Sequence, residues 1–200
     1  MSNQQTLKSK IKKLLGLSKT HAKVAFLGLD NSGKTTLLRI LQDTPISEYE
    51  SRYHRPSTWE TFQIGNLEFR EKNHSSHGHS FFNEKMSWKE YFQELDAIIY
   101  IIDSTDRSRF QQSLHLFEDI INADNLGPIP ILILGNKIDR ISAVSLEEIR
   151  NSFGLAEQTD NGVETVSYVK DKRVKLLMCS VVKKMGFMEG FLWLENILSY

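Results

Sequence analysis

Cysteine is nearly absent from this 200-residue chain, and a single thiol, Cys179, excludes a framework of disulfide bonds. One cysteine is also typical of proteins that work in a reducing compartment. No apolar run approaches the ~20 residues of a membrane-spanning helix, and no secretory signal peptide is recognisable. Net charge is missing as well, because 25 basic residues balance 25 acidic ones. We therefore do not expect a protein that binds nucleic acid through bulk charge.

The first 23 residues contain six lysines and neither aspartate nor glutamate. Their apolar residues recur at helical spacing, at Leu7, Ile11, Leu14 and Leu15. A basic amphipathic helix of this kind binds an anionic membrane surface or an acidic groove. A solvated tail whose leucines pad the domain fits the pattern equally well. Position 2 is not glycine and no prenylation cysteine ends the chain, so lipid anchoring by either route is not expected.

After this tail, apolar runs alternate with helical stretches. The runs at residues 23–29, 97–103, 131–134 and 174–179 predict buried strands, and residues 61–64 and 67–70 predict a hairpin. Helices are expected at residues 34–42, 108–122, 145–153 and 188–198. This alternation predicts an α/β fold with a mostly parallel, six-stranded sheet covered by helices on both faces.

The stretch GLDNSGKT, from Gly28 to Thr35, fits the phosphate-loop pattern G-x-x-x-x-G-K-[ST] between an expected strand and an expected helix. Backbone N–H groups of such a loop bind phosphate oxygens at a helix N-terminus. Lys34 would reach the β- and γ-phosphates, and the Thr35 hydroxyl would bind Mg²⁺. Gly28 and Gly33 would avoid a collision with the phosphates or the turn. The predicted phosphate-binding residues here are Asp30, Asn31, Ser32, Gly33, Lys34, Thr35 and Thr36.

The tetrapeptide Asn136-Lys137-Ile138-Asp139 follows an expected buried strand and favours guanine over adenine. A carboxylate at Asp139 accepts hydrogen bonds from both guanine N1–H and the exocyclic amine, a pair that adenine lacks. The Lys137 stem would lie along the base, and Asn136 would tie this loop to the phosphate loop.

A second guanine-binding segment is expected where the last strand ends, at Ser180, Val181 and Val182. A backbone N–H there would meet the guanine carbonyl oxygen. The neighbouring Cys179 is interpreted as a buried structural thiol rather than a reactive one.

These motifs carry a family resemblance. GLDNSGKTTLL resembles the Arf/Sar branch of the Ras-like small GTPases, and MCSVVKKMGFMEGFLWL at residues 178–194 is similar to the Sar GTPases of coat protein complex II (COPII). The resemblance implies a P-loop small GTPase domain over residues 21–200, preceded by a membrane-binding helix at residues 1–20. It implies GTP, GDP and Mg²⁺ as cofactors.

The same resemblance implies a role in transport from the endoplasmic reticulum (ER) to the Golgi. The expected partners are an exchange factor in the ER membrane, the GTPase-activating subunit of the inner COPII coat, and the anionic membrane surface. The expected location is the cytoplasmic face of the ER membrane, with cycling to the cytosol and to Golgi and vesicle membranes.

The chain departs from the family at the second switch, where Asp-x-Gly-Gly-His is missing. One register places the acid and histidine positions at Asn73 and His77. The other places them at Ser75 and His79, and it keeps Gly78 as the N–H that contacts the γ-phosphate. We prefer the second register, in which His79 is the catalytic residue that orients the water. Neither register supplies an acid, and losing such an outer contact to a metal costs about 10–100-fold in affinity or activity.

Three further assignments follow from this part of the sequence. In the first switch, Thr58 or Ser57 would supply the second hydroxyl on Mg²⁺. Glu71 is a weaker alternative source of the missing acid. A zinc site is not expected from His74, His77 and His79, because no cysteine accompanies them.

Two functions therefore remain open at the level of the sequence. The first is a working GTPase switch in vesicle budding, with slow and partner-stimulated hydrolysis. The second is a hydrolysis-weak recruitment module, a pseudo-GTPase that holds GTP and acts as a coat or membrane adaptor. A nucleotide kinase is less favoured, because the guanine signature would then be a coincidence.

Overall fold

The computed structural model describes residues 22–42, 59–64, 67–72, 92, 94–123, 126–156, 158–160 and 164–198. Several predictions fall outside these residues: the helix at residues 1–20, and the switch residues Ser57, Thr58, Asn73, His74, Ser75, His77, Gly78 and His79. The backbone of Glu71 is described as part of a strand, but its side chain is not.

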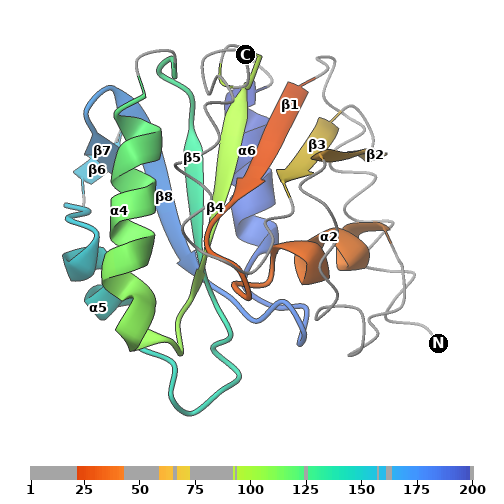
Figure 1. The fold of residues 1–200 in the computed structure, drawn as a ribbon. Coiled ribbons are helices and arrows are strands. Elements are labelled where there is room, and N and C mark those ends of the chain that lie inside the picture. Colours follow the sequence, from red (N-terminus) through yellow and green to blue (C-terminus); the bar gives the residue numbers. More distant parts are fainter. Residues whose placement is uncertain are drawn as a thin grey trace.

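The described strands form one sheet in the order β2-β3-β1-β4-β5-β8-β7-β6 (Figure 1). Their bounds are β1 Ala22–Leu27, β2 Trp59–Ile64, β3 Leu67–Lys72, β4 Ala97–Asp103, β5 Ile131–Asn136, β6 Gln158–Asp160, β7 Glu164–Val169 and β8 Lys172–Met178. The five strands β3, β1, β4, β5 and β8 run parallel. The predicted mostly parallel sheet is thus confirmed, and β2 pairs with β3 as the predicted antiparallel hairpin.

All six predicted strands are present, and the sheet extends by two more, β7 and β6, which are antiparallel. The turn from β7 to β8 contains Lys170, whose φ is 57°. Strand β8 also begins earlier than predicted, at Lys172, whose side chain is only 4% exposed and pairs with Asp171 at 2.7 Å. A buried lysine at the start of a strand resembles a solvated turn in the sequence, which explains the missed boundary.

The described helices lie close to the predicted ranges. They are α2 Lys34–Gln42, the single 3₁₀ turn η2 Arg107–Arg109, α4 Phe110–Ile121, α5 Leu146–Ser152 and α6 Met188–Leu198. The range predicted at 108–122 contains the end of η2 as well as α4. Ser145 is the N-cap of α5, and its hydroxyl accepts a hydrogen bond from the Glu148 N–H at 3.2 Å.

Helices cover both faces of the sheet, with α4 in front of it and α6 behind it in Figure 1. Alternate residues of β4 show how the strand contributes to both cores. Ile99 and Ile101 pack with residues of α2 and α6, whereas Ile98 and Tyr100 pack with residues of α4 and α5. Because both faces are covered, β4 is an unbroken apolar run rather than an alternating one.

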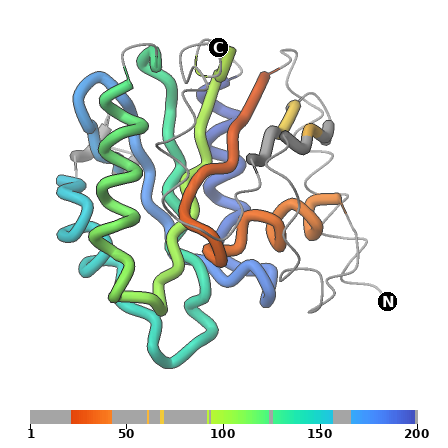
Figure 2. The backbone as a smooth tube through the Cα atoms, in the orientation of Figure 1, coloured from red at the N-terminus to blue at the C-terminus, as the bar shows by residue number. Residues whose placement is uncertain are grey.

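The parallel strands β1, β4, β5 and β8 all end at one edge of the sheet, which is the lower edge in Figures 1 and 2. Ligands of open α/β folds bind in the crevice outside the carboxyl ends of such strands. The loops that carry the sequence motifs leave the sheet at this edge.

Candidate nucleotide-binding site

The loop between β1 and α2 has the backbone of a tight anion cradle. Three of its residues have positive φ: Gly28 at 131°, Asn31 at 59° and Gly33 at 109°. A Cβ at Gly28 would overlap the carbonyl oxygen of Ile101 on β4. Both glycines are therefore required by backbone conformation as well as by space.

Lys34 begins α2 and is buried, with 7% exposure. Its Nζ donates hydrogen bonds to the carbonyl oxygens of Gly28 at 3.0 Å and Leu29 at 2.8 Å, so the ammonium group lies across the loop. Ser32 Oγ is buried and has no hydrogen-bond partner among the described residues. A buried cation and an orphaned hydroxyl in a loop of this conformation fit a phosphate group.

Asn136, at the end of β5, joins three loops through its buried side chain. Its Nδ2 donates to the Ser32 carbonyl oxygen at 2.8 Å, and its Oδ1 accepts from the Val181 N–H at 3.0 Å. We call Ser32, Asn136 and Val181 the three-loop junction. The tie from Asn136 to the phosphate loop that the sequence predicts is present. A Cβ at Gly33 would overlap the Asn136 amide, which is a packing reason for that glycine beyond those predicted.

Asp139 is exposed and is held by the loop that follows β8. Ser180 Oγ donates to Asp139 Oδ1 at 2.5 Å, and this hydrogen bond lowers the pKa of the carboxyl group below its ordinary value. The Ile138 N–H donates to the Cys179 carbonyl oxygen at 3.2 Å, so the two loops are also linked through backbone. The structure therefore places Asp139 and Ser180 side by side, with the carboxylate ionised.

Most backbone N–H groups of the loop at residues 180–185 donate within the protein. Those that do belong to Ser180, Val181, Lys183, Lys184 and Met185. The N–H of Val182, a residue that is 52% exposed, has no hydrogen-bond acceptor among the described residues.

Cys179, which directly precedes this loop, is fully buried, and burial raises the pKa of its thiol to about 12. The interpretation of Cys179 as a structural thiol is confirmed.

Lys137 makes a contact that the sequence motif does not reveal. Its φ is 71°, and its Nζ donates to Asp103 Oδ2 at 2.6 Å, where β4 ends. The other oxygen of Asp103 accepts from the Thr105 hydroxyl at 2.6 Å. Burial alone would raise the pKa of Asp103, but the hydrogen bonds from Lys137 and Thr105 outweigh it and lower the pKa. The Lys137 stem is thereby fixed in direction between β4 and β5.

A second contact that the sequence motifs do not reveal joins Asp30 of the phosphate loop to Arg109 of η2, 79 residues apart.

Within the described part of the chain, no three histidine, cysteine, aspartate or glutamate side chains gather as a metal site. Among the described residues, the Thr35 hydroxyl is the group expected to contact a divalent cation, together with the phosphates of a nucleotide. Such a ligand set suits Mg²⁺, which is commonly bound through few protein groups together with substrate phosphates.

The sequence model of the ADP-ribosylation factor (Arf) family matches residues 7–198, nearly the whole chain. The chain belongs to the Arf family. Members of the Arf family are small GTPases that bind GTP and GDP with Mg²⁺. None of the helices in the described residues is long and apolar enough to cross a membrane.

Several relatives within the Arf family match this chain over almost its full length. A "Small COPII coat GTPase SAR1" from Giardia intestinalis is 34% identical over 185 residues, which is 92% of this chain and 93% of the relative. A protein of the same name from Nicotiana tabacum is 30% identical over 190 residues, again 92% and 93% of the two chains. The "ADP-ribosylation factor K" of Dictyostelium discoideum is 30% identical over 189 residues, covering 90% and 87%. The predicted resemblance to a Sar-type member of the Arf/Sar branch is confirmed.

Proposed function

We propose that this Arf-family chain is a GTP-binding switch of the COPII coat, which binds the ER membrane when loaded with GTP. The observation that carries the nucleotide part is the three-loop junction. It holds the phosphate loop, the Asn136–Asp139 loop and the loop after β8 together at one edge of the sheet. Groups for phosphate and groups for a base then belong to one site.

Phosphate binding is assigned to Asp30, Asn31, Ser32, Gly33, Lys34, Thr35 and Thr36, with Gly78 contacting the γ-phosphate. Lys34 is the positively charged residue among them, and its ammonium is already held inside the loop. Thr35 and Thr58 would hold Mg²⁺, which neutralises phosphate charge when it is bound.

Guanine binding is assigned to Asn136, Lys137, Asp139, Ser180, Val181 and Val182. The ionised Asp139 carboxylate accepts from N1–H and the exocyclic amine, and Ser180 orients it. Since the Val181 N–H is engaged with Asn136, we assign the contact with the guanine carbonyl oxygen to the N–H of Val182.

The membrane and coat roles draw support from two sources. Two relatives that match over nearly the whole chain carry the name of a COPII coat GTPase. The lysine-rich segment at residues 1–20 suits an anionic membrane surface. We accordingly propose an ER-membrane exchange factor and the activating subunit of the inner coat as partners, and ER-to-Golgi transport as the process.

Hydrolysis is proposed to be slow and stimulated by the coat. His79 would orient the attacking water, while no acid stands at position 75 to support the metal. The lack of an acid at position 75 also favours a second candidate, a recruitment module that holds GTP with little turnover. Single-turnover hydrolysis with and without the activating coat subunit separates the two, because only a working switch is accelerated.

Nucleotide specificity gives the direct test of the site. Purified protein should bind fluorescent GDP and GTP in a Mg²⁺-dependent manner, and ATP should not compete at similar concentrations. Asp139→Asn replaces a carboxylate acceptor by an amide that also donates, so guanine affinity should fall and xanthine nucleotides should bind instead. Asp119→Asn, an exposed acid on α4, is the matched control and should bind GDP as the wild type does. ATP competition equal to that of GTP would refute the proposal.

A further inference from the structure

An acidic residue stands inside the loop that we propose binds phosphate. Asp30 lies between Gly28 and Lys34, and its side chain is 39% exposed. A carboxylate near an anion-binding backbone repels the phosphates that the N–H groups attract. Tight nucleotide binding therefore requires that this carboxylate be neutralised or directed away.

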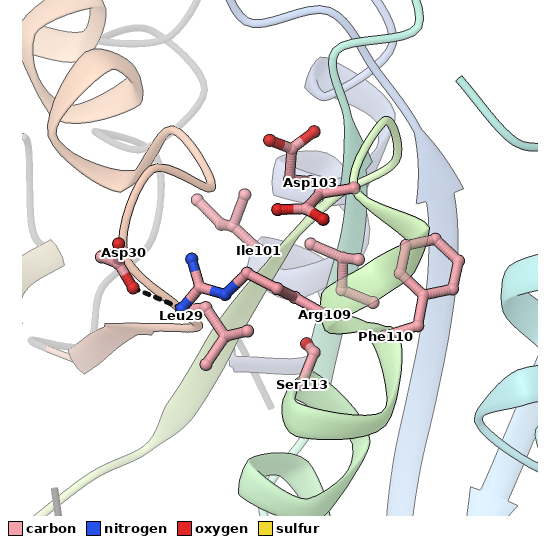
Figure 3. A pocket seen from close by; sticks show the side chains of 9 residues that line it. Leu29, Asp30, Ile101, Asp103, Arg109, Phe110 and Ser113 are labelled. Atoms are coloured by element: carbon pink, nitrogen blue, oxygen red, sulfur yellow. Dashed lines mark hydrogen bonds and ion pairs between the residues drawn. The ribbon is translucent and has the colours of Figure 1, made fainter. Parts of the chain in front are cut away.

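Arg109 makes the contact that could do so. Its Nη2 donates to Asp30 Oδ1 at 2.5 Å, and its Nε donates to Gln112 Oε1 at 2.9 Å on the first turn of α4. The guanidinium is thus held by α4, the helix that directly follows Arg109, while it pairs with the loop. Figure 3 shows the Arg109 side chain extending from the start of α4 to Asp30.

The ion pair lies at a pocket where the phosphate loop and the end of β4 meet η2 and the start of α4. Leu29, Ile101 and Phe110 are among the residues that line this pocket (Figure 3). Burial would raise the pKa of Asp30, but the hydrogen bond and charge of Arg109 outweigh it, so the pKa lies below its ordinary value. Asp30 is consequently ionised at neutral pH, and its charge has to be directed rather than removed.

We propose that Arg109 is a positioning residue of the phosphate loop, which holds the Asp30 carboxylate on the α4 side and away from the bound phosphates. This role rests on the proposed function, because it takes the loop as a nucleotide site. Without Arg109 the carboxylate is released beside the phosphates and weakens binding. The triphosphate carries more negative charge than the diphosphate, so GTP binding suffers more than GDP binding.

Three single variants isolate the charge of Arg109. Arg109→Met keeps the apolar stem and removes the charge, whereas Arg109→Lys keeps the charge. Arg107→Met is the matched control, since Arg107 lies on the same 3₁₀ turn and forms an exposed pair with Glu148 at 2.7 Å. Each full-length protein is titrated with fluorescent GDP and GTP in Mg²⁺ at low and high salt.

Arg109→Met should weaken GDP binding about fivefold and GTP binding by more, on the order expected of one partly screened charge near the phosphates. The loss should shrink at high salt. Arg107→Met should stay within about twofold of the wild type, and Arg109→Lys should recover most of the lost affinity. Equal affinities of the Arg109→Met and Arg107→Met proteins would overturn the proposal.

A double-mutant cycle with Asp30→Asn gives the decisive result. If Arg109 acts by holding the Asp30 carboxylate, Arg109→Met should cost little affinity once that carboxylate is an amide. An equal loss in both backgrounds would mean that Arg109 acts without Asp30, and it would refute the positioning role. A general folding defect of Arg109→Met would persist in the double variant, so the cycle distinguishes it too. A wild-type protein that binds neither nucleotide would overturn the proposed function and this inference together.

Discussion

Asn136→Ala should weaken both the fold and the site, because it opens the three-loop junction. The Asn136 side chain is buried, with 3% exposure of the residue, and it makes one hydrogen bond as donor and one as acceptor to backbone groups. The truncation leaves the Ser32 carbonyl oxygen and the Val181 N–H without these partners.

The magnitude follows from those two groups. Each buried polar group that loses its partner costs about 1–3 kcal/mol, which gives about 2–6 kcal/mol for the pair. We expect a value in the lower half of this range, about 3 kcal/mol, because water can enter the space left by the amide. For a chain of this length, that corresponds to a fall in Tm of about 6–12 °C.

The assay is urea and thermal unfolding of nucleotide-free and GDP-saturated protein. Asn151→Ala is the matched control, because Asn151 is an exposed asparagine on α5 and its truncation should change stability by less than about 0.5 kcal/mol. The gain in Tm from saturating GDP should also be smaller in Asn136→Ala than in the wild type. If the two variants unfold alike, the junction does not hold the loops, and the structural reasoning behind the site is wrong.

Four further outcomes are expected. Gly33→Ala combines a φ of 109° with overlap of the junction amide, so it should lower stability by more than about 1 kcal/mol and weaken GDP binding; unchanged values would contradict the packing account. The pKa of Asp103 is lowered in the folded protein, so the ionised carboxylate contributes fully to stability above its ordinary pKa of 3.8. This contribution is lost as the pH falls through the lower pKa of the folded state. The urea midpoint of Asp103→Asn should therefore fall less on acidification than that of the wild type. Flotation with anionic vesicles should require residues 1–20 and fall sharply with salt, since each lysine contributes about 1 kcal/mol near the surface; salt-independent flotation would count against it. His79→Ala should abolish coat-stimulated hydrolysis and leave nucleotide affinity almost unchanged. Ser75→Asp should raise the affinity for Mg²⁺. Intrinsic hydrolysis by the wild type that is faster than the Ras rate of about 10⁻⁴ s⁻¹ would argue against the chosen register of the second switch.

Local chemistry made much of the fold predictable. The run at residues 97–103 is apolar throughout because two helical layers cover it, and its predicted bounds match β4. The bounds of α2 and α6 were likewise predicted, since a glycine turn fixes the start of α2 and apolar spacing marks α6. The β6–β7 hairpin was missed because β6 has only three residues, all of them polar, and because β7 alternates polar and apolar residues without forming an apolar run. Strand β8 also opens on a buried lysine.

In the site, the contact between Asn136 and the phosphate loop was predicted because the motif itself requires it. The ion pairs of Asp30 with Arg109 and of Lys137 with Asp103 were not. Each joins a charged residue of a motif to a charged residue outside it, 79 or 34 positions away along the chain. Only the strand order of the sheet brings these partners together, and single-chain patterns do not encode that order. For this reason the positioning role of Arg109 emerges from the structure alone.

The division of the apolar core by the sheet has a consequence for how this chain tolerates change. The buried residues behind the sheet, with α2 and α6, and those in front of it, with α4 and α5, form separate sets that share no side chain. Substitutions on opposite faces should therefore add in their effects on stability, provided that they lie more than about 7–10 Å apart. Each face can accumulate substitutions without compensation from the other. Both faces pack against the same strand backbones, and these strands lead into the loops at the carboxyl edge. Substitutions on either face can therefore affect the nucleotide site.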